Sequence, residues 1–157
     1  MRREDREITA FADIVQIMEK CDVCRLALFD EEYPYILPLN FGMQVEDEKV
    51  ILYFHGATEG KKYDLIDQNN KVSFEMDCSH RLVTDEIKRS CTMEYESVIG
   101  QGKIEMISDA EEKYEALCVL MKHYHKEDFA FNRDVISKTK VFKLTVQNMT
   151  GKKRMKK

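Results

Sequence analysis

The segment Leu52–Lys62, with the sequence LYFHGATEGKK, combines residue types that can bind an anion. An apolar, aromatic run ends in small residues, and Lys61 and Lys62 then open a helical pattern. Thr58 is the expected N-cap, because its hydroxyl can accept a backbone N–H of the first turn. Free amides, the helix dipole and both lysines favour an anion, with phosphate the first candidate. The segment lacks the P-loop pattern Gly-x-x-x-x-Gly-Lys-[Ser/Thr], so the residues alone leave the anion open.

Three other residue types could carry chemistry near this segment. His55 ends a strand beside the anion loop, where its ring could contact a ligand or serve the structure alone. Asn40 is unfavourable in a strand, which predicts a polar partner nearby, and Phe41 is either a core residue or the wall of a ligand site. His123 and His125 are two residues apart and do not share a helix face, so they are poor joint metal ligands.

The five cysteines form no clear metal or redox motif. Cys21 and Cys24 make a Cys-x-x-Cys pair, but it enters a strand and lacks the helix N-terminus that lowers a thiol pKa. A zinc site would need two further ligands, so no metal is expected and burial is the better interpretation. Cys78 and Cys91 flank a polar segment and could lie close together; Cα atoms more than about 7 Å apart would exclude a disulfide.

The elements that must position these residues are mainly strands. Apolar residues at helical spacing predict a helix over residues 8–20, a short helix over Thr58–Gln68, and a third that Ser108 and Glu111 open as a capping box. The expected strands are Cys24–Phe29, Tyr35–Met43, Val50–His55, Lys71–Met76, Met93–Ile107 and Lys140–Val146. Ser79–Ser90 is expected to be a polar excursion between strands, and Gly100 and Gly102 to bend the long strand. The strands are mostly neighbours in sequence, which predicts an antiparallel barrel decorated by helices.

Length and charge further narrow the class of protein. The chain has 157 residues and 25 Lys and Arg against 29 Asp and Glu, so one domain is expected and no general nucleic-acid surface. The domain is expected over residues 1–150, and residues 151–157 are expected to form a basic tail that is solvated or folds over a ligand. No segment reaches the roughly 18 apolar residues of a membrane span, and no secretory signal is seen. The odd cysteine count fits a reducing cytoplasm.

Four blocks of sequence together resemble one family. They are CDVCRLALFD at 21–30, YPYILPLNFGM at 33–43, LYFHGATEGKKYDLI at 52–66 and YESVIGQGKIEMISDAEEK at 95–113. The chain resembles the FMN-binding split-barrel proteins related to pyridoxamine-phosphate oxidase, in particular the Nim-type nitroimidazole-resistance branch. The resemblance implies a mainly β (α+β) fold, a six-stranded antiparallel split β-barrel with flanking helices. It also implies a homodimer with FMN at each end of the subunit interface.

The resemblance also implies which residues touch the cofactor. The loop His55–Lys62 would hold the flavin phosphate, Pro38–Phe41 would run beside the isoalloxazine ring, and Tyr95–Gly102 would lie at the dimer interface. The implied cofactor-binding residues are Pro38, Leu39, Asn40, Phe41, Phe54, His55, Gly56, Ala57, Thr58, Gly60, Lys61, Lys62, Ser97 and Val98. Lys61, with Lys62, would neutralise the phosphate, and His55 would be the catalytic candidate as a proton donor or ligand contact.

The function that follows is an FMN-dependent oxidoreductase acting on a small, nitroaromatic-like substrate, with NAD(P)H as a candidate electron donor. Vitamin B6 oxidation is not favoured, because the basic residues for its substrate phosphate and the C-terminal substrate-binding segment have no clear counterpart here. Two alternatives stay open: a flavin carrier or sensor module without turnover, and a haem-binding split barrel. The same FMN site would serve an enzyme and a carrier, so the sequence does not separate them.

Overall fold

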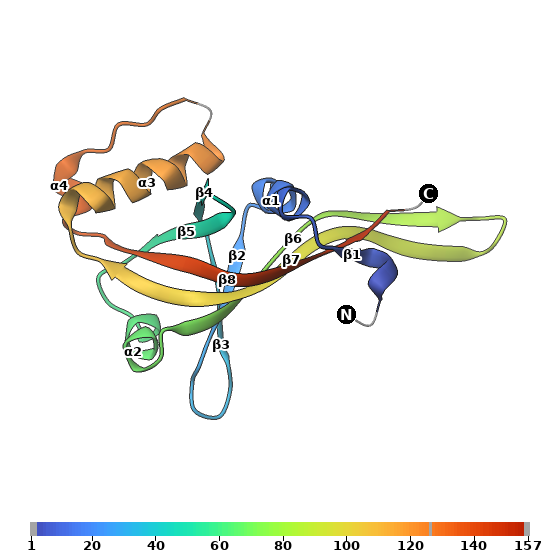
Figure 1. Ribbon diagram of the computed structural model, residues 1–157, viewed down its shortest axis with the longest axis horizontal. Coiled ribbons are helices and arrows are strands. Elements are labelled where there is room, and N and C mark those ends of the chain that lie inside the picture. Colours follow the sequence, from blue (N-terminus) through green and yellow to red (C-terminus); the bar gives the residue numbers. More distant parts are fainter. Residues whose placement is uncertain (1–2, 126, 156–157) are drawn as a thin grey trace.

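The computed structural model describes residues 3–125 and 127–155, and almost all strands belong to one curled antiparallel sheet (Figure 1). The strands run β3-β2-β6-β7-β8-β5-β4, and the short β1 pairs with β8. The strands are β1 (Glu7–Ile8), β2 (Cys24–Leu28), β3 (Tyr35–Leu39), β4 (Gly42–Glu46), β5 (Lys49–Gly56), β6 (Lys71–Asp85), β7 (Ser90–Ile107) and β8 (Lys140–Arg154). The helices are the 3-10 turn η1 (Glu4–Arg6), α1 (Phe11–Lys20), α2 (Lys61–Gln68), α3 (Ala110–Tyr124) and α4 (Arg133–Ile136).

The curled sheet forms a split barrel, in which the two edge strands β3 and β4 are consecutive in the chain but do not pair with each other in the described structure. Only Asn40 and Phe41 separate β3 from β4, yet these strands end the sheet on opposite sides. Within the described residues no ladder joins β3 to β4, so the curled sheet stays open at this seam. The predicted single strand Tyr35–Met43 is therefore two strands. With β1 this gives eight strands where the sequence predicts six.

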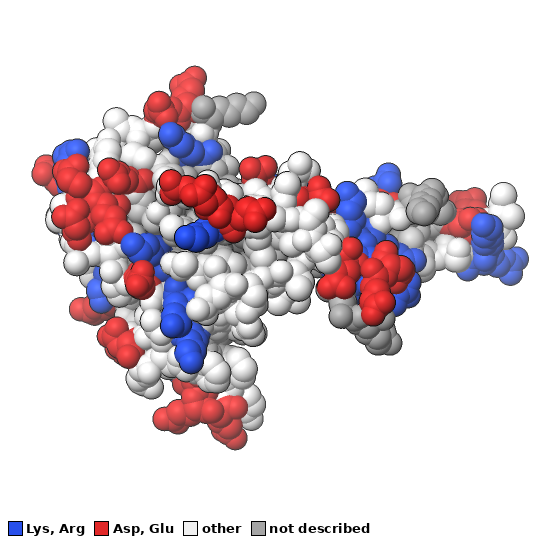
Figure 2. Space-filling model, viewed as in Figure 1, with Lys and Arg blue, Asp and Glu red and all other residues white. Residues whose placement is uncertain are grey.

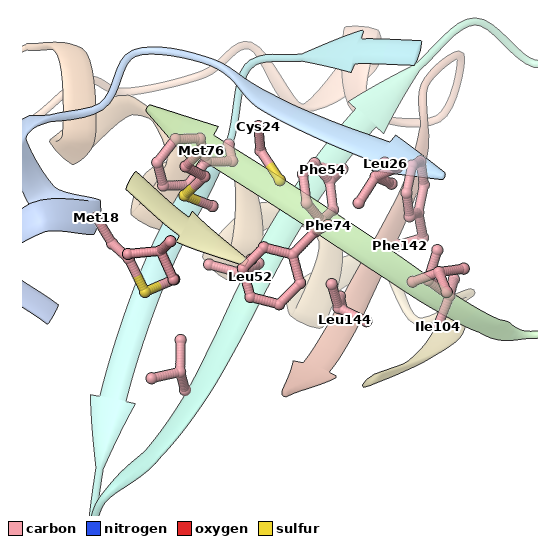
Figure 3. Packing of buried hydrophobic residues seen from close by; sticks show 14 of the residues in the cluster. Met18, Cys24, Leu26, Leu52, Phe54, Phe74, Met76, Ile104, Phe142 and Leu144 are labelled. Atoms are coloured by element: carbon pink, nitrogen blue, oxygen red, sulfur yellow. The ribbon is translucent and has the colours of Figure 1, made fainter. Parts of the chain in front are cut away.

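Alternating apolar residues build the barrel interior, as the sequence predicts. Val72, Phe74 and Met76 on β6 are buried, while the intervening Ser73 and Glu75 are partly exposed. Figure 3 shows Phe74 and Met76 among side chains from β2, β5, β7, β8 and α1. Fully removing such side chains from water contributes about 1.5–3 kcal/mol each, which makes this cluster the main source of the fold's stability.

Close approaches of the backbone explain why glycines lie along the long strand β7. A Cβ on Gly100 would come within 2.4 Å of the Phe74 ring, and one on Gly102 within 2.2 Å of the Thr145 carbonyl oxygen. The pairing of β7 with β8 shifts between Gln101 and Gly102. The predicted bend therefore lies at a register irregularity where neither position has room for a side chain.

The predicted polar excursion is a regular hairpin arm. β6 and β7 stay paired from Arg81–Glu94 to Asp85–Ser90, and the arm projects from the body (Figure 1). Cys91 pairs with Thr84, six residues along β6 from Cys78, so the two cysteines lie about 20 Å apart along the arm at 3.3 Å per residue. The expectation that these cysteines lie close is wrong, and all five cysteines are free thiols.

Two buried carboxylates tie α1 and the arm to the sheet. Glu96 is 3% exposed and pairs with Lys20 of α1 at 2.5 Å and with Lys153 of β8 at 2.8 Å. Burial alone would raise the pKa of Glu96, but hydrogen bonds from Lys153, Lys20 and Ser79 hold it at about 2. Glu94, 1% exposed, accepts from Arg81 at 2.8 Å.

Several predicted boundaries move in the structure. Residues 151–154, assigned to a basic tail, form the end of β8 and pair with β7 and β1; residues 156–157 lie outside the described residues. The N-cap of α3 is Asp109, whose carboxylate accepts from the Glu112 amide at 2.9 Å, and not Ser108. Asp109 replaces Ser108 because an aspartate caps at least as well and carries charge that favours the helix N-terminus.

The Cys-x-x-Cys pair is buried, as the sequence favours. Cys21 is 2% and Cys24 0% exposed, and burial raises the pKa of both thiols. Buried, protonated thiols are poor nucleophiles and poor metal ligands. Among the residues that the structure describes, no group of three or more His, Cys, Asp and Glu side chains could hold a metal ion. None of the described helices is long and apolar enough to span a membrane.

Candidate functional site

The loop between β5 and α2 ends in a helix start without a side-chain cap. α2 begins at Lys61, and its N-cap is Gly60, whose φ of 147° suits glycine. No side chain caps this helix, so the prediction of Thr58 as N-cap is wrong. The Tyr63 amide donates to the Gly60 carbonyl oxygen at 3.0 Å, whereas the amides of Lys61 and Lys62 have no acceptor within the described helix and no capping side chain. The loop that the sequence predicts as an anion site thus ends in an uncapped helix start and is exposed, and anion binding there stays a prediction.

Two half-buried lysines flank the ring of Tyr63 beside this helix start. The Nζ atoms of Lys62 and Lys140 lie 4.6 and 4.3 Å from the Tyr63 ring centroid. Lys140 pairs with Gly56 at the start of β8, about eighty residues further along the chain than α2. In the described part of the chain neither ammonium forms an ion pair, so both charges are available to an anion. Sequence reasoning missed Lys140, because only strand pairing brings it here.

Tyr63 and Gly56 hold the loop in shape. The Tyr63 hydroxyl donates to the Ala57 carbonyl oxygen at 2.7 Å, and its ring is 5% exposed. A Cβ on Gly56 would lie 2.8 Å from that hydroxyl and 3.0 Å from Lys62 Nζ. Glycine at this position therefore leaves space for the lysine above the loop.

Lys61 differs from its neighbour because it already has a carboxylate partner. Its Nζ lies 2.6 Å from Asp30 Oδ2 and 5.5 Å from the centroid of the Tyr35 ring. The hydrogen bond to Asp30 raises the pKa of Lys61. This contact ties the α2 start to the β2–β3 hairpin, and it makes Lys62 the freer of the two cations.

His55 is the histidine best placed for chemistry. It lies at the end of β5, exposed, and pairs with Val141 of β8. Partial desolvation and then the charge of Lys62 lower the pKa of His55, which favours the neutral ring. The other histidines have partners: His80 contacts Asp77, His123 the Cys21 carbonyl oxygen, and His125 the Glu127 carbonyl oxygen. Within the described residues His55 has no hydrogen bond of this kind.

The predicted flavin-ring segment, Pro38–Phe41, lies at the seam of the barrel. Asn40 Nδ2 donates to the Asp22 carbonyl oxygen at 3.4 Å, which supplies the polar partner that the sequence predicts. Phe41 is fully buried, its amide donates to the Tyr124 hydroxyl at 3.0 Å, and its ring packs 4.3 Å from that of His123. The Phe41 side chain therefore belongs to the core. Pro38 is exposed and Leu39 partly exposed.

The remaining predicted residues do not join this site within one chain. Phe54 and Val98 are 0% exposed, and Phe54 stacks on Phe142. Ser97 pairs with Lys152, whereas His55 pairs with Val141, so eleven residues of β8 separate them. That is about 35 Å along the strand, too far for one small ligand to touch both. His55, Gly56, Ala57, Thr58, Gly60, Lys61 and Lys62 do lie together in one loop.

Comparison with known proteins places the chain in a defined group. The family model described as Pyridoxamine 5'-phosphate oxidase matches residues 12–153. A crystal structure of a proposed 5-nitroimidazole antibiotic resistance protein from Bacteroides thetaiotaomicron is 36% identical, with 93% of this chain and 85% of that chain covered and a TM-score of 0.82. No curated protein sequence matches the chain.

Two more distant structures share the fold. The flavocytochrome Anf3 from Azotobacter vinelandii is 17% identical over 99% of this chain and 72% of that chain, with a TM-score of 0.78. The FAD and heme binding protein from Mycobacterium smegmatis is 18% identical over 96% and 74%, also with a TM-score of 0.78. At these identities the likeness extends to the fold alone.

Proposed function

The chain belongs to the pyridoxamine 5'-phosphate oxidase family, and from this premise we propose that it binds FMN and acts as an oxidoreductase on a small molecule. Proteins of the same fold are described as binding FAD, or FAD and heme, which supports a flavin as the cofactor class. The nitroimidazole-resistance relative supports a nitroaromatic-like substrate. Five free thiols are in keeping with a reducing cytoplasm.

The uncapped start of α2 with Lys62 and Lys140 is the observation that carries the proposal. A phosphate monoester carries a charge of about −1.5 to −2 near pH 7, which two ammonium groups balance. The free amides of Lys61 and Lys62 add hydrogen-bond donors at the positive end of the helix dipole. FMN ends in such a monoester, so these residues fit its phosphate. The bound flavin would supply hydride or single-electron transfer, and the protein would position it.

A second copy of the chain would complete the site. Ser97, expected beside the flavin, is about 35 Å from His55 along β8 in one chain, so it would come from the partner. The sheet face that carries Ser97 also carries Ile99, 58% exposed, and Arg25 and Glu75 lie on the strands beside it. A two-fold dimer through this face would bury the same patch on both subunits.

His55 is the residue assigned to the substrate side. Its neutral ring beside Lys62 can accept a hydrogen bond from a substrate or hold a proton for it. NAD(P)H is the proposed electron donor.

The absorbance spectrum of protein purified without added cofactor, with the mass of the released ligand, tests the cofactor. We expect the bands of oxidised flavin and the mass of FMN. An intense Soret band would replace the proposal by a haem-binding split barrel. Stopped-flow mixing of the flavin-loaded protein with NAD(P)H then tests turnover, since a flavin that no donor bleaches would indicate a carrier or sensor.

Lysine substitutions test the phosphate site. Lys62→Ala and Lys140→Ala should each weaken FMN binding about tenfold or more, because each removes a charge-assisted contact. Lys61→Ala should weaken it less, since Lys61 already pairs with Asp30. The double change at Lys61 and Lys62 should greatly weaken binding and leave the fold intact. Affinity is measured by flavin fluorescence quenching, with Lys103→Ala on β7 as a surface control.

Unchanged affinity in the double variant would remove the phosphate assignment. A larger loss in Lys61→Ala than in Lys62→Ala would reverse the order of the two lysines. Circular dichroism of each variant separates both outcomes from misfolding.

A further inference from the structure

A second cluster of cations lies far from α2, where the N-terminal segment crosses β7 and β8 at the base of the arm (Figure 1). Its centre is Tyr95, half-buried on β7. Lys152 Nζ lies 5.7 Å from the centroid of the Tyr95 ring, and the charges of Lys152 and Arg6 both act on the Tyr95 phenol. Arg154 pairs directly with Tyr95 and shares its face of the sheet.

Arg6 is poorly neutralised although most of its side chain is covered. The side chain is 16% exposed, and Asp5 approaches it only to 3.9 Å. Both carboxylate oxygens of Asp5 are engaged by Arg3 at 2.7 and 2.6 Å, in the two-pronged geometry that a guanidinium prefers. Among the residues that the structure describes, Arg6 therefore keeps donors that no carboxylate satisfies well.

The local field at the cluster is positive in spite of its acidic neighbours. Desolvation alone would raise the pKa of Tyr95, yet hydrogen bonds and charge from Lys152 and Arg6 lower it. Besides Asp5, the acidic residues nearby are Glu7, which pairs with Lys152 from β1, and the exposed Glu4 of η1. Asp77 on β6 lies in the same cross-strand row as Lys152, with Ser97 between them, and already pairs with Arg25 at 2.6 Å. The effect of the cations on the pKa of Tyr95 is larger than that of these carboxylates, because the pKa is lowered.

We propose that Tyr95, Arg6 and Lys152 form an oxyanion-binding site that takes the phosphate group of a small ligand other than the flavin. A guanidinium, an ammonium and a phenol supply several donors to one point, which suits the oxygens of a phosphate. The site needs neither flavin nor a second copy. In the proposed dimer the Tyr95 strand lies near the flavin, so a phosphate-bearing reductant is its expected ligand, and that step alone rests on the proposed function.

Figure 2 shows how charged side chains are distributed on one face of the molecule. On the face shown, charged residues gather over the body and along the arm, with uncharged side chains between them. Within one chain Lys140 and Lys152 are twelve residues apart on β8, about 40 Å along the strand, so the two clusters can be altered independently.

Tyrosine titration in the flavin-loaded protein tests the proposal. The ultraviolet absorbance of phenolate is followed against pH with and without pyrophosphate, and the difference from Tyr95→Phe isolates Tyr95. Pyrophosphate should raise the Tyr95 midpoint by neutralising its cations. Arg6→Gln and Lys152→Gln should weaken pyrophosphate binding about tenfold each. The control Lys103→Gln, a lysine on the same strand as Tyr95, should bind pyrophosphate as the unaltered protein does.

Two outcomes would overturn the site: a Tyr95 midpoint that pyrophosphate does not move, or full binding in Arg6→Gln and Lys152→Gln. Equal affinity for pyrophosphate and a nucleoside diphosphate supports recognition of phosphate alone, and tighter binding of the nucleotide supports a nucleotide ligand. Lys62→Gln with Lys140→Gln, titrated without flavin beside the flavin-free unaltered protein, should keep the Tyr95 response. That result would show that the Tyr95 site does not depend on the FMN phosphate site, so each of the two proposals can fail while the other holds.

Discussion

At the scale of single residues, the site depends on which cations already have partners. Lys61 and Lys62 are adjacent in sequence, but Lys61 pairs with Asp30 and Lys62 lies over Tyr63. An ammonium with a carboxylate partner must give up that contact before it can bind a phosphate, whereas an unpaired one need not. The free ammonium of Lys62 also acts on His55, because it disfavours a second positive charge nearby.

The pKa of His55 gives a direct measure of this coupling. In the flavin-free protein it should lie below 6.5, and it should rise in Lys62→Ala and on FMN binding, since both remove or neutralise the charge of Lys62. Because the folded pKa is below the unfolded one, His55 costs stability as the pH falls below 6.5. FMN binding should therefore take up protons in that range. NMR titration of the imidazole checks this, and a His55 midpoint unchanged in Lys62→Ala would contradict it; Lys61→Ala is the control.

At the scale of elements, α3 locks the seam of the barrel. The Tyr124 hydroxyl at its end accepts from the Phe41 amide and donates to the Asp22 carbonyl oxygen at 2.8 Å. The helix also packs closely on β4, because Gly42 leaves its backbone room to approach Leu120. These contacts hold the connection between β3 and β4, which carries the expected flavin-ring segment.

Gly42→Ala should loosen this contact. The added Cβ would lie 2.5 Å from the Cα and N atoms of Leu120, and backbone atoms of a helix cannot turn aside as a side chain can. We expect a loss of about 1–3 kcal/mol in the free energy of unfolding, measured with urea. Val45→Ala, an exposed position on the same strand, should change it by less than about 0.5 kcal/mol. A Gly42→Ala protein as stable as the control would show that α3 shifts without cost.

At the scale of the whole molecule, one face of the sheet has large apolar side chains in contact with water. Ile36 on β3 is 64% and Ile99 on β7 58% exposed, and the arm adds Leu82 at 61%. A two-stranded hairpin with no further packing is marginally stable in water. Both features fit a fold whose face and arm pack against a second copy.

Ile99→Lys should weaken self-association, because it removes apolar surface and places an ammonium at the interface, where its desolvation is costly. The dimer dissociation constant should rise about tenfold or more, and FMN affinity should fall with it. Sedimentation at several protein concentrations measures the first and fluorescence the second. Val45→Lys, at an edge strand, serves as the control. An unaltered chain that is monomeric with FMN bound would refute the two-subunit site.

Local patterns were sufficient for most elements and for the position of the loop before α2. The alternation of Val72, Phe74 and Met76 requires one buried face, so it predicts β6 from a few residues. The resemblance to the FMN-binding split barrel, read from four sequence blocks, is confirmed by the family match over residues 12–153. Helix caps were less predictable, because Ser108 and Asp109 are both good caps and the backbone geometry chooses between them.

The sequence by itself determined most of the strands, the loop with its two lysines and the family. Only the tertiary structure decided that Lys140 joins Lys62 over Tyr63, that Cys78 and Cys91 are far apart, and that Arg6 and Lys152 meet at Tyr95. The reason is strand register. Local periodicity determines on which face of the sheet a residue lies. Which residues lie opposite one another depends on the packing of the whole sheet.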